Sequence, residues 1–98
     1  MNTNANITAR FELGRTLITP GAQEAIEAAG QAPHEFLQRH EAGDWGDALS
    51  ENDRRENELS VEQGFRILSA YCTSKGQRIW VITEADRSAT TILLPEEY

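Results

Sequence analysis

The residues with the clearest chemical potential lie in one short polar segment, residues 84–88, between two apolar stretches. Glu84 or Asp86 could act as an acid or a base there, and Arg87 could hold an anion. The same segment is also typical of a turn that Asp86 and Ser88 close with hydrogen bonds, with Arg87 paired to a carboxylate. We favour the turn. Because loops on a rigid sheet often carry function, Glu84, Asp86 and Arg87 are kept as candidate binding residues.

A second candidate is the turn sequence of residues 43–47, Gly-Asp-Trp-Gly-Asp. Carboxylates beside glycines suit calcium, but the regular Asp-x-Asp-x-Asp-Gly loop and its closing glutamate are absent. We therefore predict a turn in which Trp45 fills the edge of the core, because tryptophan is usually largely buried. Trp45 and Asp47 are kept as candidate residues of an interaction surface, together with Arg54 and Arg55.

Two histidines and one cysteine are the remaining side chains suited to metal binding or nucleophilic catalysis. His34 and His40 fall on different sides of a helix, so we expect surface or boundary positions rather than zinc ligands. Cys72 has no partner for a disulfide, and its alternation with Ala70 predicts a small core residue. Phosphate-binding glycine loops and nucleophile elbows are absent from the sequence. The sequence predicts no metal, no cofactor and no catalytic residue, and it favours a protein that is not an enzyme.

Charge is distributed unevenly along the chain. The whole sequence has 16 acidic and 9 basic residues, a net charge of −7, which argues against direct binding to nucleic acid or anionic lipid. Residues 41–62 hold eight acidic and two basic residues, whereas residues 63–83 hold three basic residues and no acidic one. The acidic segment is either a solvated polar face or a surface that docks a basic protein partner, and both interpretations stay open.

The elements that must position these residues follow from periodicity and capping signals. Apolar residues alternate from Ile7 to Leu13, which predicts an extended segment within residues 9–18, interrupted at Gly14. Thr19 and Ser50 are expected to cap helices, and Arg54 and Arg55 are spaced for surface ion pairs with Glu58. Helices are predicted over 20–29, 33–41 and about 51–58, and strands over 65–73, 77–84 and 90–94.

Together the elements predict one α+β domain over residues 9–98, preceded by a flexible tail of residues 1–8. Its small antiparallel sheet is expected to be a C-terminal three-stranded meander that an N-terminal strand could join, with two or three short helices on one face. The other face is then partly solvated or covered by a partner. No apolar run approaches the roughly 20 residues of a membrane helix. The lack of a signal sequence and the single cysteine favour a cytoplasmic protein.

Several segments together carry a family resemblance. They are residues 19–22, 40–47 and 53–58, and above all 78–88 and 93–98, which read Arg-Ile-Trp-Val-Ile-Thr-Glu-Ala-Asp-Arg-Ser and Leu-Leu-Pro-Glu-Glu-Tyr. The chain resembles a family of small uncharacterised proteins of bacterial plasmids and integrative conjugative elements, often labelled "plasmid-related protein" or type I restriction subunit M. A methyltransferase subunit needs an S-adenosylmethionine fold and an Asn-Pro-Pro-Tyr type of motif, and neither is present. The resemblance therefore implies a setting on mobile elements, where such proteins often serve plasmid upkeep, transfer or escape from host defence.

The leading functional hypothesis is a small acidic protein that binds a protein partner with a basic surface. Anti-defence or DNA-mimic action on a mobile element is one concrete version of it. An alternative is a ribonuclease-like or anion-binding protein that uses the basic hairpin, with its site at Arg66, Arg78, Glu84 and Arg87. A third is a structural protein that pairs its open sheet edge or face with a second copy, as a homodimer or larger homo-oligomer.

Overall fold

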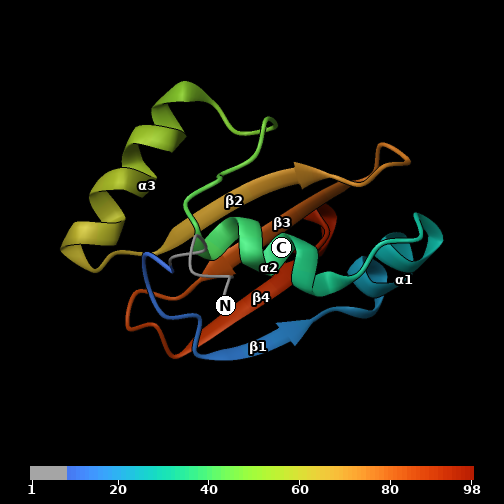
Figure 1. The fold of residues 1–98 in the computed structure, drawn as a ribbon, viewed down its shortest axis with the longest axis horizontal. Coiled ribbons are helices and arrows are strands. Elements are labelled where there is room, and N and C mark those ends of the chain that lie inside the picture. The colour runs from blue at the N-terminus through green and yellow to red at the C-terminus, as the bar shows by residue number, and fades with distance from the viewer. Residues whose placement is uncertain (1–8) are drawn as a thin grey trace, which may run out of the picture.

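The structure is a computed structural model that describes residues 9–98, so the predicted tail of residues 1–8 lies outside it. It confirms the α+β class, with three α-helices and a four-stranded sheet in the described residues (Figure 1). In chain order the elements are β1 (Arg15–Ile18), α1 (Pro20–Ala28), α2 (Pro33–Glu41), α3 (Glu51–Gln63), β2 (Ile67–Cys72), β3 (Arg78–Thr83), β4 (Ala89–Leu93) and the 3₁₀ turn η2 (Pro95–Glu97).

The sheet is mixed, with the strand order β1-β4-β3-β2. The last three strands form the predicted antiparallel meander, in which Val81 lies opposite Ser69 on β2 and opposite Ile92 on β4. Strand β1 joins the sheet as well, but it runs parallel to β4, with Ile18 opposite Ile92. The sheet is thus not exclusively antiparallel as predicted, because apolar alternation indicates which side of a strand is buried but not the direction of its neighbour.

Strand β1 is shorter than the extended segment predicted within residues 9–18. Gly14 has a positive φ of 67° and turns the chain where it meets the loop of residues 84–88. A Cβ atom at Gly14 would overlap backbone atoms of that loop, so glycine is required for this close approach. The residues before the turn leave the sheet, and the Phe11 ring packs edge-on against His40, with 5.1 Å between the ring centres.

Helices α1 and α3 begin directly after the predicted capping residues, Thr19 and Ser50, and α1 ends at Ala28, one residue before its predicted end. The hydroxyl oxygens of Thr19 and Ser50 accept backbone N–H groups of the first turns of α1 and α3, at 3.2 and 3.1 Å. Helix α2 has the predicted bounds. Helix α3 is longer than predicted, because it continues to Gln63 and ends only where Gly64 adopts a left-handed conformation with φ 77°.

The inner face of the sheet packs against α1 and α2, and Figure 1 shows α2 crossing in front of the strands. Trp45 is buried at 4% exposure, which confirms that it fills the edge of the core. The main cluster of buried apolar residues is Ala22, Ile26, Phe36, Tyr71, Ile79, Val81 and Ile92, and a smaller one beneath the 43–49 segment is Trp45, Leu49, Ile67 and Ala70.

Helix α3 lies beside strand β2 and seals its edge (Figure 1). The Asn57 side chain donates to the Leu68 carbonyl at 2.6 Å and accepts the Leu68 N–H at 3.1 Å, as a neighbouring strand would. Next along the edge, Ala70 donates to the Trp45 carbonyl at 3.0 Å and accepts from Ala48 at 3.3 Å. The two hydrogen bonds of Asn57 hold α3 at the border of the outer face of the sheet.

Candidate binding groove

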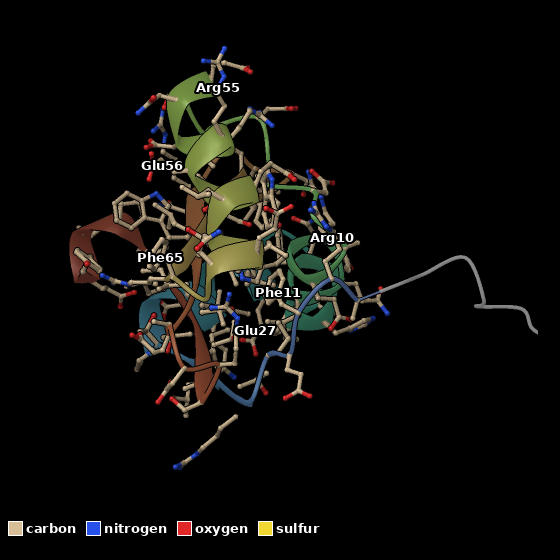
Figure 2. All side chains as sticks on the ribbon, turned by 90° about the vertical axis from the view of Figure 1, so that its left-hand side faces the viewer. Arg10, Phe11, Glu27, Arg55, Glu56 and Phe65 are labelled. Atoms are coloured by element: carbon tan, nitrogen blue, oxygen red, sulfur yellow. The ribbon has the colours of Figure 1, made fainter. Side chains whose placement is uncertain are left out.

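A groove of about 500 Å³ opens on the outer face of the sheet, between α3 and Tyr98. Its first wall is one side of α3, its floor is formed by side chains of β2 and β3, and its second wall is formed around Tyr98. Figure 2 shows Glu56 and Phe65 on the same side of α3, toward the C-terminal segment. The lining residues are Asp53, Glu56, Asn57, Ser60, Phe65, Arg66, Leu68, Trp80, Ile82 and Tyr98.

The helical wall follows from the spacing of residues 53, 56, 57 and 60, which places them on one side of α3. Asn57 and Ser60 are buried at its base, where Asn57 bonds to β2 and the Ser60 hydroxyl donates to the Glu56 carbonyl at 2.8 Å. Asp53 and Glu56 are exposed. The wall therefore has an anchored polar base and a rim of two carboxylates.

Three aromatic rings surround the rest of the groove. Phe65 is 53% exposed and Tyr98 is 67% exposed, which is high for such large apolar side chains. Trp80 is half-buried on β3 and meets the Tyr98 ring edge to face, with 5.7 Å between their centres. Exposed apolar groups gathered in one hollow are typical of an interaction site.

The charged groups of the groove form no ion pairs with each other or with other groups in residues 9–98. These groups are the carboxylates of Asp53 and Glu56 and the guanidinium of Arg66. The Arg66 guanidinium carbon lies 5.1 Å from the centre of the Tyr98 ring, a cation–π contact that leaves its charge unneutralised. The groove thus combines apolar area, two free carboxylates and one free cation, which suits binding of a ligand with an apolar part and complementary charges.

Trp45 does not line the groove, but the buried cluster to which it belongs packs against the floor residues Leu68 and Trp80. Its indole Nε1 donates to Glu58 Oε2 at 2.9 Å, and Arg10 donates to both oxygens of that carboxylate at 3.1 and 2.8 Å. Hydrogen bonds from Arg10 and then Trp45 lower the pKa of Glu58. The predicted pairing of Glu58 with Arg54 or Arg55 is wrong, because the two-pronged contact with Arg10 takes the carboxylate.

Asp47, Arg54 and Arg55 also lie outside the groove. Arg54 donates to the backbone oxygen of Gly46, and its guanidinium lies 4.0 Å from the Asp47 carboxylate. Arg55 and Glu51 are both highly exposed and lie 4.0 Å apart, one helical turn from each other. Such exposed pairs contribute little to stability and leave these residues on the general surface.

The loop of residues 84–88 is the predicted turn, in which Asp86 Oδ1 accepts the Ser88 N–H at 3.0 Å. Hydrogen bonds from Ser88 lower the pKa of the Asp86 carboxyl. Arg87 has a positive φ of 61° and donates to four backbone carbonyls, including that of Ser60 in α3 at 2.9 Å. The expected pairing of Arg87 with a carboxylate is wrong, because the loop lies beside the end of α3, whose last carbonyls need donors.

The structure places three residues of the ribonuclease-like alternative, Arg66, Glu84 and Arg87, near the same end of β2 and β3. The Arg87 guanidinium donates its hydrogen bonds to backbone carbonyls, and the Arg66 guanidinium lies over the Tyr98 ring. Arg78 pairs in register with Cys72, at the far end of β3 from Glu84. Of these four residues, Arg66 alone lines the groove.

His40 is fully buried, so its expected surface or boundary position is wrong. Its Nδ1 lies 2.6 Å from Ser69 Oγ and its Nε2 lies 2.8 Å from Thr83 Oγ1. Thr83 Oγ1 is 2.7 Å from Thr90 Oγ1, which itself donates to the carbonyl of Leu13 at 2.7 Å. Burial, and secondarily Arg87, lowers the pKa of His40 to about 3. A helical pattern shows that residue 40 faces the core, but not that the opposing strands supply two hydroxyls.

The direction of these hydrogen bonds fixes the form of the imidazole. Thr90 uses its proton for the Leu13 carbonyl, so it accepts from Thr83, and Thr83 in turn accepts from His40 Nε2. The Nδ1 atom is then the acceptor for the Ser69 hydroxyl. His40 is therefore a neutral, fully satisfied core residue without access to solvent.

Cys72 is exposed, so its expected core position is wrong. It shares the outer face with Ala70, but the 45–48 segment covers Ala70 and stops short of the strand end. His34 is exposed, in agreement with a surface position. No cluster of three metal-ligating side chains occurs in the part of the chain that the structure describes.

Comparisons with protein-family models, with curated proteins and with solved structures give no match to this chain. Across the described residues, no helix combines the length and the apolar character needed to cross a membrane.

The sequence reasoning missed most of the groove. Asp53 was assigned only to the start of a helix, and Glu56, Phe65, Trp80 and Tyr98 were not assigned to any site. Two signals could have found them. Residues 66, 68, 80 and 82 alternate with the buried inner-face residues of the same strands, and residues 53 and 56 share a side of the helix that precedes them.

Proposed function

We propose that the protein is a non-enzymatic binding module that docks a basic segment of a protein partner in this groove. The observation that supports it is the conjunction of exposed rings, Phe65 and Tyr98, with the unpaired carboxylates of Asp53 and Glu56. Aromatic residues are the usual anchors of protein interfaces, and complementary charge selects and steers the partner.

The charge pattern of residues 41–62 supports docking at the groove over an extended acidic surface. Four of its eight acidic residues, Asp44, Asp47, Glu51 and Glu58, each lie within 4.0 Å of an arginine. A DNA mimic needs a broad array of unpaired negative charges to replace phosphates. Here half of these carboxylates lie near arginines. Of the four that do not, Asp53 and Glu56 line the groove, whereas Glu41 and Glu62 lie outside it.

The setting is part of the same proposal. The resemblance to small plasmid and conjugative-element proteins supports a role in the cytoplasm of a cell that carries such an element, with a partner encoded by the host or by the element. Interference with a host defence protein through its basic segment is the version that this setting favours. Direct binding of nucleic acid is disfavoured by the net charge of −7.

A selection from a random twelve-residue peptide library, displayed on phage over the immobilised protein, tests the proposal. We expect enrichment of basic peptides with apolar residues, whose synthetic copies bind Asp53→Asn/Glu56→Gln about threefold to tenfold more weakly than the wild type. The control Glu12→Gln/Glu24→Gln removes the same charge at exposed positions outside the groove and should bind like the wild type. Failure to enrich any peptide, or equal binding to the charge-deleted variant, contradicts the proposal.

A further inference from the structure

The groove carries free charges of both signs, and they lie at different places along it. Asp53 and Glu56 belong to the first two turns of α3, whereas Arg66 follows the end of that helix and lies over Tyr98. Elsewhere on this helix, Arg55 and Glu51 form a loose pair at 4.0 Å, one helical turn apart. These three groups form no such pair within residues 9–98.

Arg66 differs from the arginines that hold this fold together. Arg10 and Arg39 donate to carboxylates, and Arg54 and Arg87 donate to backbone carbonyls. The Arg66 guanidinium makes no hydrogen bond or ion pair within the described chain and lies over the Tyr98 ring, so its five N–H donors are available. A guanidinium with free donors is suited to a planar carboxylate, which it binds through two parallel hydrogen bonds.

We infer that the docked segment carries an acidic residue for Arg66 as well as a basic one for Asp53 and Glu56, and that these two charges fix the direction in which it lies. An apolar residue between them covers Leu68 and Trp80 on the floor of the groove. This inference rests on the proposed function and names the chemistry of its partner, a mixed-charge polypeptide segment with an apolar centre.

Direction follows from the cost of the opposite arrangement. In a reversed segment the basic side chain meets Arg66 and the acidic side chain meets the carboxylates of α3, so both contacts become repulsive. Charges across an interface contribute to specificity and register more than to affinity, because desolvation offsets much of their attraction. A purely basic segment would satisfy α3 but would place its positive charge beside Arg66.

Parallel peptide selections on the wild type, Arg66→Gln and Arg66→Glu test the inference. We expect peptides from the wild type to carry a basic and an acidic residue on either side of an apolar one. The acidic residue should disappear from peptides selected on Arg66→Gln, and a second basic residue should replace it on Arg66→Glu. The control Arg78→Gln removes an exposed arginine outside the groove and should select the same peptides as the wild type.

A synthetic copy of the best wild-type peptide and its reversed sequence then test direction. We expect the reversed peptide to bind at least about tenfold more weakly, measured by titration calorimetry. Enriched peptides that are basic but lack the acidic residue, or equal binding of the reversed peptide, overturn the inference and leave the proposed function standing. A lack of enrichment on all three proteins overturns the proposed function itself.

Discussion

Polar groups are hydrogen-bonded and buried on the inner face of the four-stranded sheet, whereas charged groups are exposed and unpaired at the groove on its outer face. On the inner face Ser69, Thr83 and Thr90 are buried, and each has a hydrogen-bond partner in a network centred on His40. On the outer face Asp53 and Glu56 stay unpaired beside exposed rings. Within the described residues, no buried side-chain nitrogen or oxygen lacks a partner, so the free polar groups are confined to the surface.

This difference separates the source of stability from the source of recognition. A satisfied buried network specifies one packing of α2 against the sheet, because any shift would leave a polar group without a partner in a low-dielectric interior. Groups that stay free at the groove contribute little to folding and keep their interactions for a ligand. Substitutions on the inner face should therefore change the free energy of unfolding, and substitutions at the groove should change the affinity for a ligand.

The largest effect is expected from His40→Ala. It removes a buried ring and leaves the Ser69 and Thr83 hydroxyls without their partner, so the free energy of unfolding should fall by about 2–4 kcal/mol. Urea denaturation measures this loss. The matched control His34→Ala removes the exposed histidine of the same helix, α2, and should change the free energy of unfolding by no more than about 0.5 kcal/mol. Equal effects at the two positions would remove the distinction between the faces.

The pH dependence of stability should carry the signature of the same residue. Because the pKa of His40 falls from 6.5 to about 3 on folding, His40 is protonated in the unfolded chain and neutral in the folded chain at pH values between these two. Stability is complete above the unfolded pKa and falls as the pH drops below 6.5, at up to about 1.4 kcal/mol per pH unit. Between pH 7 and pH 5 the expected loss is about 2 kcal/mol.

The carboxylates with lowered pKa values change stability mainly below this pH range. Asp44 and Glu58, whose pKa values Arg39 and Arg10 lower from 3.8 and 4.5, lose their contribution only at more acid pH. Urea denaturation at a series of pH values therefore isolates the histidine between pH 5 and 7. The slope in that interval should disappear in His40→Gln, and a slope that persists there would show that another group is responsible.

Much of the inner face could be predicted from the sequence, because local signals determine it. The Thr19 cap sets the start of α1, which packs on this face, through a contact within a few residues. Strand alternation gave the meander. The burial of His40 was not foreseen, because it depends on hydroxyls that strands Ile67–Cys72 and Arg78–Thr83 bring to it from distant parts of the chain.

The outer face could be predicted only in outline. Sequence reasoning expected it to be partly solvated or covered, and the groove lies there, but its residues come from a helix, two strands and the C-terminal segment. The same non-local effect misplaced Arg87: the loop chemistry was right at Asp86, but the end of α3 supplied the partners of the arginine. The groove and the partners of Arg87 both depend on contacts between elements that are distant in the sequence, and local sequence patterns do not indicate such contacts.

The smallest effect on stability is expected at the groove, from Phe65→Ala/Tyr98→Ala. Both rings are more than half exposed, so the free energy of unfolding should change by less than about 1 kcal/mol, an order of magnitude set by their small burial. Binding should respond in the opposite sense: loss of two aromatic anchors should weaken a selected peptide by about tenfold or more.

The matched control for this variant is Leu59→Ala, which shortens a 45% exposed apolar side chain of α3 that does not line the groove. It should leave both stability and peptide affinity close to those of the wild type, measured by urea denaturation and by titration calorimetry. If the double variant unfolded as readily as His40→Ala, the two rings would be structural, and the outer face would not be the separate recognition surface that its free charges and exposed rings indicate. If it kept full stability and full affinity, the peptides would bind elsewhere on the molecule.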